Sequence, residues 1–572
     1  MFESLPSDVK TFMDWGWGQI EPYYDELAAR ELNATTVDQW LKDWTSLGEL
    51  INESYTLLFV ATTVDTTDEA ATKRFHSYLG DIMEKMEPKE QVLREKILAS
   101  GLQPPGFEIA LRNIQTDVNL FREENVPLFT EEQKLSNEHD RIIGAQTVIW
   151  EGKELTLAQL KPIMNAAERP VREQIWRLIS ERRLADRPAL NKLWGQFLEL
   201  RLKMTKNAGY ENYRDFRWQQ FKRFDYTPED CLTFHEAIEK VVVPAATRVY
   251  ERQRRKLGVE SVRPWDLDRD DVHPSSRPPL HPYQTVEELE SKAEAIFRQV
   301  DPYLAEYFTT MRREKLLDLD NRKGKAPGGY CTTLNRSHRA FIFMNAVGVH
   351  DDVQTLLHEA GHAFHAFETV KLPYNQQRDV PIEMCEVASM SMELLSAPYL
   401  PASQGGYYSA KDAARARIEH LEQNILFWPY MSVVDAFQHW VYSNPQDALD
   451  AANCDEQWGK LWARFIPGAD WSGLEDARVT GWHRKPHIFD VPFYYVDYGL
   501  AQMGAVQVWR NALRDQANAV RQYREALALG GTRSLPELFA AAGAKFAFDA
   551  VTLGELINLM ETTIHDLESV QD

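Results

Sequence analysis

Residues 353 to 367 read Val-Gln-Thr-Leu-Leu-His-Glu-Ala-Gly-His-Ala-Phe-His-Ala-Phe, and this stretch directs the interpretation of the whole chain. Its apolar residues recur at helical spacing, so we expect a helix. Residues four apart lie on one helix face, so His358 and His362 can point two imidazoles at a single metal ion. The carboxylate of Glu359 then lies beside the metal, where it can accept a proton from a metal-bound water. The pentapeptide from His358 to His362 therefore predicts a catalytic zinc site.

His365 and Glu368, further along the same helix, are the first candidates for the third protein ligand that a catalytic zinc requires. His365 lies seven residues after His358, about 10 Å along the axis at a rise of about 1.5 Å per residue, which is too far for the same ion. Glu368 matches the ligand spacing of the extended HExxHxxGxxH pattern, but that pattern needs a glycine where this chain has His365. We therefore expect His365 to be an outer or packed residue, and we reject Glu368 as a ligand.

A second helix offers the remaining carboxylates. Asp379-Val380-Pro381 is typical of a helix start, and residues 382 to 395 continue with helical character. This helix carries Glu383, Glu386 and Glu393. Glu383 and Glu386 lie three apart and share one face, so spacing alone leaves the choice between them open.

Composition limits the class of protein. A chain of 572 residues is long enough for two to four domains, or for one large two-lobed body with a deep cleft. A net charge of -22 makes nucleic acid an unsuitable partner, because a phosphate backbone would be repelled. The sequence has no apolar run long enough for a membrane span and no visible secretory signal. Its four cysteines form no CxxC pair, so we expect free thiols and a cytoplasmic location.

Two stretches interrupt a chain that otherwise has the pattern of packed helices. Residues 261 to 285 contain five prolines, so we expect a connecting excursion. Residues 339 to 345 are short, aromatic-rich and bounded by polar residues, which predicts a strand just ahead of the zinc helix. Its edge, at Ala340, Ile342 and Met344, could bind an extended peptide through main-chain hydrogen bonds. A strand that merely supports the helix fits the spacing equally well.

Several motifs accompany the pentapeptide. They are His358 to His365 itself, Glu386-Val387-Ala388-Ser389, Gly209 to Arg214, Lys323-Gly324-Lys325, Phe343-Met344-Asn345, Pro486-His487-Ile488-Phe489 and Pro492 to Tyr498. Together they resemble the zinc oligopeptidases of the thimet oligopeptidase and oligoendopeptidase F family, and the oligoendopeptidase F branch most closely. The resemblance covers about residues 200 to 560, and the combination of motifs is far more specific than the pentapeptide alone.

The resemblance implies roles for particular residues. It makes Glu386 the third ligand of one zinc ion per chain, beside His358 and His362, with Glu393 as an outer or packing residue. It also implies that the C-terminal block supplies hydrogen-bond donors to the oxyanion of the reaction. These donors would be Tyr498 first, with His487 and Tyr495 as helpers. The adjacent Tyr494 leaves the alignment of the first tyrosine of this block open.

The resemblance also implies a fold and an activity. We expect a mainly α-helical, two-lobed oligopeptidase with a deep central cleft and a small β-sheet beside the zinc site. Residues 1–200 would form an N-terminal helical lobe, and residues 201–572 the catalytic lobe. The expected reaction is hydrolysis of internal peptide bonds in short, unfolded peptides, with Glu359 assisting attack by zinc-bound water. The alternatives are an exopeptidase of the dipeptidyl carboxypeptidase type and an inactive peptide-binding protein, in which Glu359 would have no use.

Overall fold

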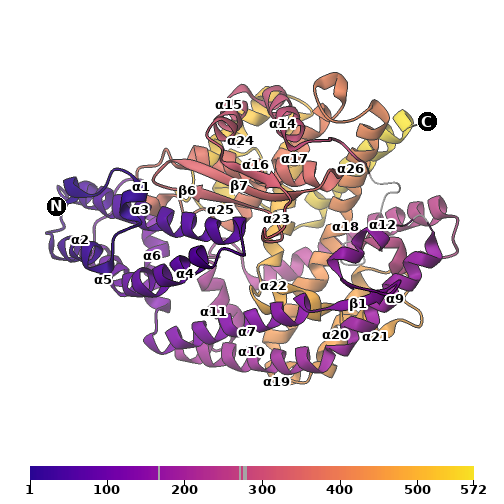
Figure 1. The fold of residues 1–572 in the computed structure, drawn as a ribbon, viewed down its shortest axis with the longest axis horizontal. Helices are drawn as coiled ribbons and strands as arrows, with labels where there is room; N and C mark the ends of the chain where they lie inside the picture. The colour runs from indigo at the N-terminus through magenta and orange to yellow at the C-terminus, as the bar shows by residue number, and fades with distance from the viewer. Residues whose placement is uncertain (165, 167, 269–271, 275–279, 572) are drawn as a thin grey trace. The chain divides into compact units, whose positions relative to one another are not determined.

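The computed structural model describes residues 1–572 except 165, 167, 269–271, 275–279 and 572, and most of these residues are helical (Figure 1). Residue contacts divide the chain into two compact units, each built from three segments. Unit 1 comprises residues 1–119, 280–413 and 504–546, and unit 2 comprises residues 120–279, 414–503 and 547–572. Among the described helices, none is both long and apolar enough to cross a bilayer. The expectation of a mainly helical fold with small sheets is confirmed.

Unit 1 carries most of its helices in its first two segments and a three-stranded sheet in the second. Its elements are α1 (Val9–Phe12), α2 (Trp17–Ala29), α3 (Val37–Val64), α4 (Glu69–Tyr78), α5 (Glu84–Ser100), α6 (Glu108–Leu120), α14 (Val286–Val300), α15 (Pro302–Arg313), β5 (Leu317–Asp320), β6 (Tyr330–Leu334), β7 (Arg339–Ala346), α16 (His350–Thr369), α17 (Ile382–Ser396), α24 (Gln516–Ala528) and α25 (Leu535–Ala541).

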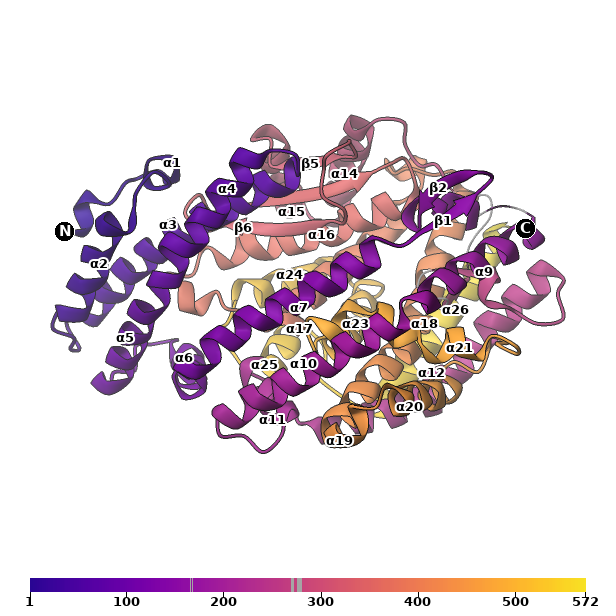
Figure 2. The ribbon, with the colours of Figure 1, turned by 60° about the horizontal axis from the view of Figure 1, so that its bottom comes forward.

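Unit 2 contains both long and short helices and two antiparallel strand pairs. Its elements are α7 (Val126–Gly144), β1 (Thr147–Trp150), β2 (Lys153–Thr156), α8 (Lys161–Met164), α9 (Arg169–Ala185), α10 (Arg187–Asn207), α11 (Tyr213–Gln220), α12 (Pro228–Leu257), β3 (Leu267–Asp268), β4 (His273–Pro274), α19 (Pro445–Ala448), α20 (Ala451–Phe465), α21 (Glu475–Val479), α22 (Pro486–Phe489) and α26 (Ala550–Gln571). The residues of α18 (Ala410–Ser443) and α23 (Tyr495–Ala512) fall partly in each unit. Figure 2 shows α7 and α10 running side by side.

The units do not follow the division at residue 200 that the sequence analysis expected. The N-terminal helices bury a core that includes Tyr374, whose ring lies 5.7 Å from that of Phe107. Arg378 also donates to Glu49 at 2.8 Å. These contacts join the first 119 residues to the segment that carries α16 and α17, whereas residues 120–200 belong to unit 2. A division by position along the chain misses such long-range packing.

The three-stranded sheet of unit 1 has the order β5-β7-β6. Strand β7 pairs in parallel with β5 and antiparallel with β6, so it is the central strand. The predicted strand is therefore present, but the prediction that it offers a free edge is wrong. Ala340, Ile342 and Met344 are at most 2% exposed, because partner strands flank β7. Figure 1 shows α16 beside this sheet, as the alternative of a supporting strand predicts.

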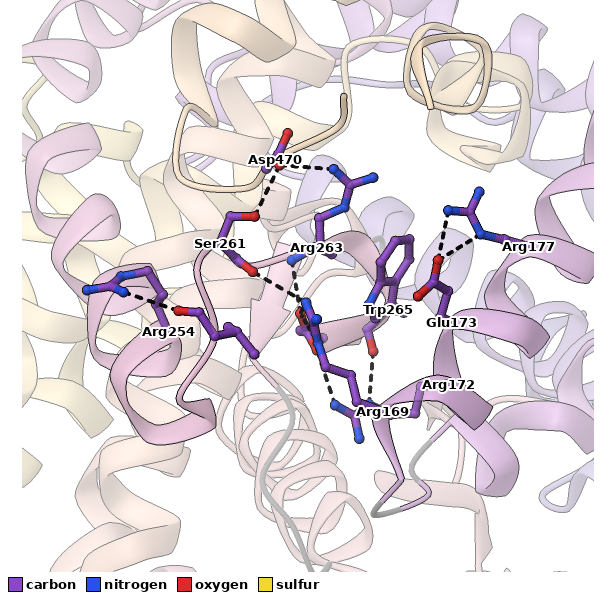
Figure 3. Close-up of polar contacts among 11 residues, drawn as sticks. Arg169, Arg172, Glu173, Arg177, Arg254, Ser261, Arg263, Trp265 and Asp470 are labelled. Atoms are coloured by element: carbon purple, nitrogen blue, oxygen red, sulfur yellow. Dashed lines mark hydrogen bonds and ion pairs between the residues drawn. The ribbon is translucent and has the colours of Figure 1, made fainter. Parts of the chain in front are cut away.

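The first residues of the proline-rich excursion, 261–266, are anchored on α9 (Figure 3). The fully buried Asp266 accepts hydrogen bonds from Arg169 at 2.7 Å and from Arg172 at 3.1 Å. Arg263 lies over the ring of Trp265 and also pairs with Asp470 at 2.9 Å. A buried carboxylate needs such compensation, since an unpaired charge in a protein interior is costly. Residues 269–271 and 275–279 of the excursion lie outside the described residues.

Candidate metal centre

Helix α16 begins at a fixed place because Asp352 binds the backbone ahead of it. Its Oδ2 accepts the backbone N–H groups of Val347, Gly348 and Val349 at 2.8 to 2.9 Å. Tyr283 donates its hydroxyl to the same oxygen. These contacts tie the loop ahead of the helix to its first turn, and a carboxylate there also complements the helix dipole. The helix then runs to Thr369 and carries the whole pentapeptide.

Helices α16 and α17 cross at Gly361. A Cβ at this position would lie 2.5 Å from Ser389 Cα and 2.6 Å from Ala388 O. No side chain larger than hydrogen fits there without moving one of the helices. The glycine of the pentapeptide therefore sets the separation of the two helices and, with it, the distance from the two histidines to Glu386.

His358, His362 and Glu386 place three ligand atoms together, all within 4.8 Å of one another. Glu386 Oε2 lies 3.5 Å from His358 Nε2 and 3.7 Å from His362 Nε2. These separations are long for hydrogen bonds. They are close to the distance of about 3.4 Å between ligand atoms of a tetrahedral zinc site with bonds of about 2.0 to 2.2 Å. The donor set and its spacing thus fit one zinc ion.

Glu393 orients the first histidine from outside the group. Its Oε1 lies 2.6 Å from His358 Nδ1, so Nδ1–H donates to the carboxylate and Nε2 is left to face the other ligand atoms. Such a carboxylate–histidine contact is common behind zinc ligands, because it holds the tautomer and raises the basicity of the ring. Glu386 is held in turn by Ser389, whose hydroxyl donates to Oε2 at 3.1 Å. The expectation that Glu393 is an outer residue fits this geometry.

The other candidate ligands lie outside this group of three among the described residues. Glu383 is buried one turn before Glu386, yet it contributes no ligand atom to the group. His365 is buried, and that burial lowers its pKa to about 4. Glu368 accepts hydrogen bonds from Tyr307 at 2.9 Å and from Arg524 at 3.0 Å, so its carboxylate is engaged in an ion-pair network instead.

The acidic surroundings shift the ionisation of the site. Burial raises the pKa of Glu359 to about 7, with further contributions from the nearby Glu386 and Glu393 carboxylates. A backbone hydrogen bond from Cys331 on β6 acts in the opposite direction and holds this carboxylate. Burial alone would lower the pKa of His358, but the hydrogen bond and charge of Glu393 raise it to about 9. Glu359 is therefore able to exchange a proton near neutral pH.

The predicted residues of the C-terminal block lie together in unit 2. The ring of His487 on α22 lies 4.8 Å from that of Tyr495 and 5.9 Å from that of Tyr498, both on the first turn of α23. Tyr494 packs against Tyr498 at 5.2 Å. Lys485 donates to the hydroxyl of Tyr495 at 3.0 Å. Lys485 directly precedes the block in the chain, but no motif in the sequence marks it as part of the block.

Comparison with known proteins places these features in a family. The model of the family "Peptidase family M3" matches residues 163–555, which is more than two thirds of the chain. The chain belongs to peptidase family M3. Peptidases of this family are zinc-dependent, which agrees with the donor set of α16 and α17. The predicted resemblance to this family is confirmed.

Individual M3 relatives are distant in sequence and near in structure. An oligoendopeptidase F homolog of Borreliella burgdorferi is 20% identical over 287 residues, which are 49% of this chain and 48% of that protein. One of Lactococcus lactis subsp. lactis is 23% identical over 374 residues, 60% of this chain and 59% of that protein. The matched parts thus span about half to three fifths of these relatives. The solved structure of PZ peptidase A with inhibitor 2 superposes with a TM-score of 0.86 over the full length of both chains at 24% identity, which shows the fold.

Proposed function

We propose that this M3 peptidase is a zinc-dependent endopeptidase that hydrolyses internal bonds of short, unfolded peptides. The observation that carries the proposal is the spacing of His358, His362 and Glu386, which fits one tetrahedral zinc ion at this group. The oligoendopeptidase F names of several relatives agree with the endopeptidase assignment.

In this proposal each side chain around the ion has a separate task. The bound zinc would act as a Lewis acid that polarises the scissile carbonyl and lowers the pKa of a water molecule. Glu393 keeps His358 in the tautomer that presents Nε2. Glu359 accepts a proton from the attacking water on its carboxylate and delivers it to the nitrogen of the leaving amine. Its buried position beside the two histidines places the carboxylate next to the proposed ion, where both transfers would occur.

The C-terminal block would stabilise the charge that develops on the carbonyl oxygen. Tyr498 is the first candidate donor, and His487 and Tyr495 are helpers, as the family resemblance implies. Their rings pack on one another within unit 2, which restricts their motion. Donors that are already oriented need little reorganisation as the charge forms, and this is the main source of their effect on rate.

In this proposal the strand that pairs with the peptide is β6 and not β7. Strand β6 is an edge of the three-stranded sheet, and its residue Cys331 is hydrogen-bonded to Glu359 through the backbone. An extended peptide that pairs with β6 would receive main-chain hydrogen bonds next to the proposed base. Such pairing gives affinity with little dependence on side-chain sequence.

Blocked peptides test the assignment against its alternatives. A quenched fluorogenic peptide with an acetylated N-terminus and an amidated C-terminus should be cleaved internally, and a zinc chelator should abolish this cleavage. A dipeptidyl carboxypeptidase would cleave only the version with a free C-terminal carboxylate. Stoichiometric zinc without turnover of either peptide would identify an inactive peptide-binding protein.

A further inference from the structure

Two helices of unit 2 bring together four side chains of a kind that ligate metals. Helix α12 carries Cys231 and His235, and α18 carries Asp435 and His439. Each pair is four residues apart and so lies on one helix face. Cys231, Asp435 and His439 offer ligand atoms within 4.8 Å of one another, and His235 Nε2 lies 2.9 Å from Asp435 Oδ2. This group shares no residue with the catalytic one, which belongs to unit 1.

The position of α12 is set by strong local signals. Thr227 caps its N-terminus by accepting the backbone N–H of Asp230, and the carboxylate of Asp230 accepts the backbone N–H of Thr227. Gly258 ends the helix with a positive φ of 63°, a conformation that glycine adopts without strain. Cys231 and His235 are therefore in the first turns of a well-defined helix and are not in a loop.

The four side chains are buried, and part of their hydrogen-bonding capacity is unused. Cys231 and Asp435 are fully buried, and His235 and His439 are at most 4% exposed. Among the described residues, neither ring nitrogen of His439 has a partner with hydrogen-bond geometry. Asp435 Oδ1 likewise accepts no hydrogen bond from them. His439 Nε2 does lie 3.3 Å from Asp435 Oδ2. An unsatisfied buried polar group costs about 1 to 3 kcal/mol, so these atoms need a partner.

Aromatic rings pack against both histidines of the group. The ring of His439 lies 5.2 Å from that of Phe493 and 5.9 Å from that of Trp218. The ring of His235 lies 6.4 Å from that of Phe465. An apolar shell of this kind strengthens the attraction between an ion and its ligands.

We propose that Cys231, Asp435 and His439 bind a borderline-soft divalent transition metal, for which Zn²⁺ is the first candidate. Sulfur, nitrogen and carboxylate oxygen together match the preference of zinc, whereas Mg²⁺ and Ca²⁺ prefer oxygen alone. One thiolate and one carboxylate neutralise a divalent ion, so the buried centre carries no net charge. Binding breaks the S–H bond of Cys231 and releases that proton to solvent.

His235 has the role of an outer partner in this site. Its Nε2–H donates to Oδ2 of Asp435, which leaves Oδ1 as the oxygen directed to the ion. Outer contacts of this kind orient first ligands and are typical of built metal sites. A structural ion pair between Asp435 and a protonated His439 is the competing account. It leaves Asp435 Oδ1 and one histidine nitrogen unsatisfied and gives the thiol no role.

Cobalt substitution of the full-length protein tests the site. Co²⁺ bound to a thiolate absorbs in the near ultraviolet through sulfur-to-metal charge transfer, and the catalytic group of two histidines and a glutamate contains no sulfur. Protein stripped with a chelator and reloaded with Co²⁺ should therefore show this band. Cys231→Ser should abolish the band. His439→Gln, which keeps the thiol, should weaken Co²⁺ binding at this site by about tenfold or more.

Cys454→Ser is the matched control, because Cys454 is another buried thiol of unit 2 and donates to Ala448 O at 3.3 Å. This variant should keep the band. A cobalt-saturated wild-type protein without the band would overturn the proposal. This experiment uses the wild-type protein, so it does not require that any variant folds. A band that survives Cys231→Ser would overturn it as well. Glu386→Ala separates the two sites, because it should remove peptidase activity and leave the band intact.

Discussion

Replacement of Gly361 by alanine should weaken metal binding without touching a ligand. The new Cβ would lie 2.5 Å from Ser389 Cα and 2.6 Å from Ala388 O, whereas ordinary contacts are 3.4 to 4 Å. Both neighbours are backbone atoms of α17, so no side chain can rotate away. The helices must separate by about 0.9 Å or more at the crossing, and overpacking of this kind typically costs about 1 to 3 kcal/mol.

The same displacement acts on the ligand set. Moving α17 away from α16 would carry Glu386 from its present 3.5 and 3.7 Å to about 4.5 Å from the histidine nitrogens. That distance exceeds what one tetrahedral zinc with bonds of about 2.0 to 2.2 Å can bridge. We expect the zinc affinity of Gly361→Ala to fall by at least about tenfold, and its peptidase activity to fall with it. Competition with a coloured chelator measures the affinity directly.

Gly195 in the middle of α10 supplies the control, because a Cβ there meets no described atom within 4 Å. Gly195→Ala should stabilise the protein by up to about 1 kcal/mol through helix propensity alone and leave zinc affinity unchanged. If Gly361→Ala bound zinc as tightly as the wild type, the argument that this crossing sets the ligand spacing would be refuted.

Three further changes test the proposed roles. Glu359→Gln should keep zinc bound and lower kcat by about 10² to 10⁴, because it removes the base and no ligand; near wild-type turnover would contradict this. Glu386→Ala should lose zinc on purification whereas Glu383→Ala should retain it, and metal analysis of both variants would show the opposite pattern if the ligand choice were wrong. Tyr498→Phe should lower kcat by about 10² to 10³ with little change in KM, and Tyr494→Phe should have a much smaller effect. Equally mild kinetics for the two tyrosine variants would move the oxyanion role to His487 or Tyr495.

The zinc helix could be predicted because its information is local. The spacing of His358 and His362 and the apolar pattern around them lie within one helix. The choice of Glu386 over Glu383 needed the family resemblance, since both glutamates lie on one helix face. Which of the two glutamates faces the histidines depends on where α17 crosses α16. In the sequence, Gly361 is the signal for that crossing.

The differences from the sequence-based expectations concern how segments pair with one another and not which elements form. Strand β7 has the composition of any buried strand, and its central place depends on β5 and β6, which are short and weakly patterned. The lobe boundary at residue 200 stays a prediction, and the two units differ from it because Tyr374 packs among N-terminal helices. The sequence alone likewise does not bring together the pairs on α12 and α18. Each has i,i+4 spacing, but about 200 residues separate Cys231 from Asp435.

The alternation of the chain between the two units has a consequence for how it is made. Each unit needs three segments, and the last helix, α26, packs on α12. During synthesis neither unit can finish folding until residues beyond 500 have left the ribosome. Until then, apolar helix faces of the incomplete units remain exposed. Domains of this kind fold slowly and depend on protection from aggregation. A fragment restricted to residues 163–555 would lack the first 119 residues of unit 1, so expression of the family-matched region alone should give insoluble protein.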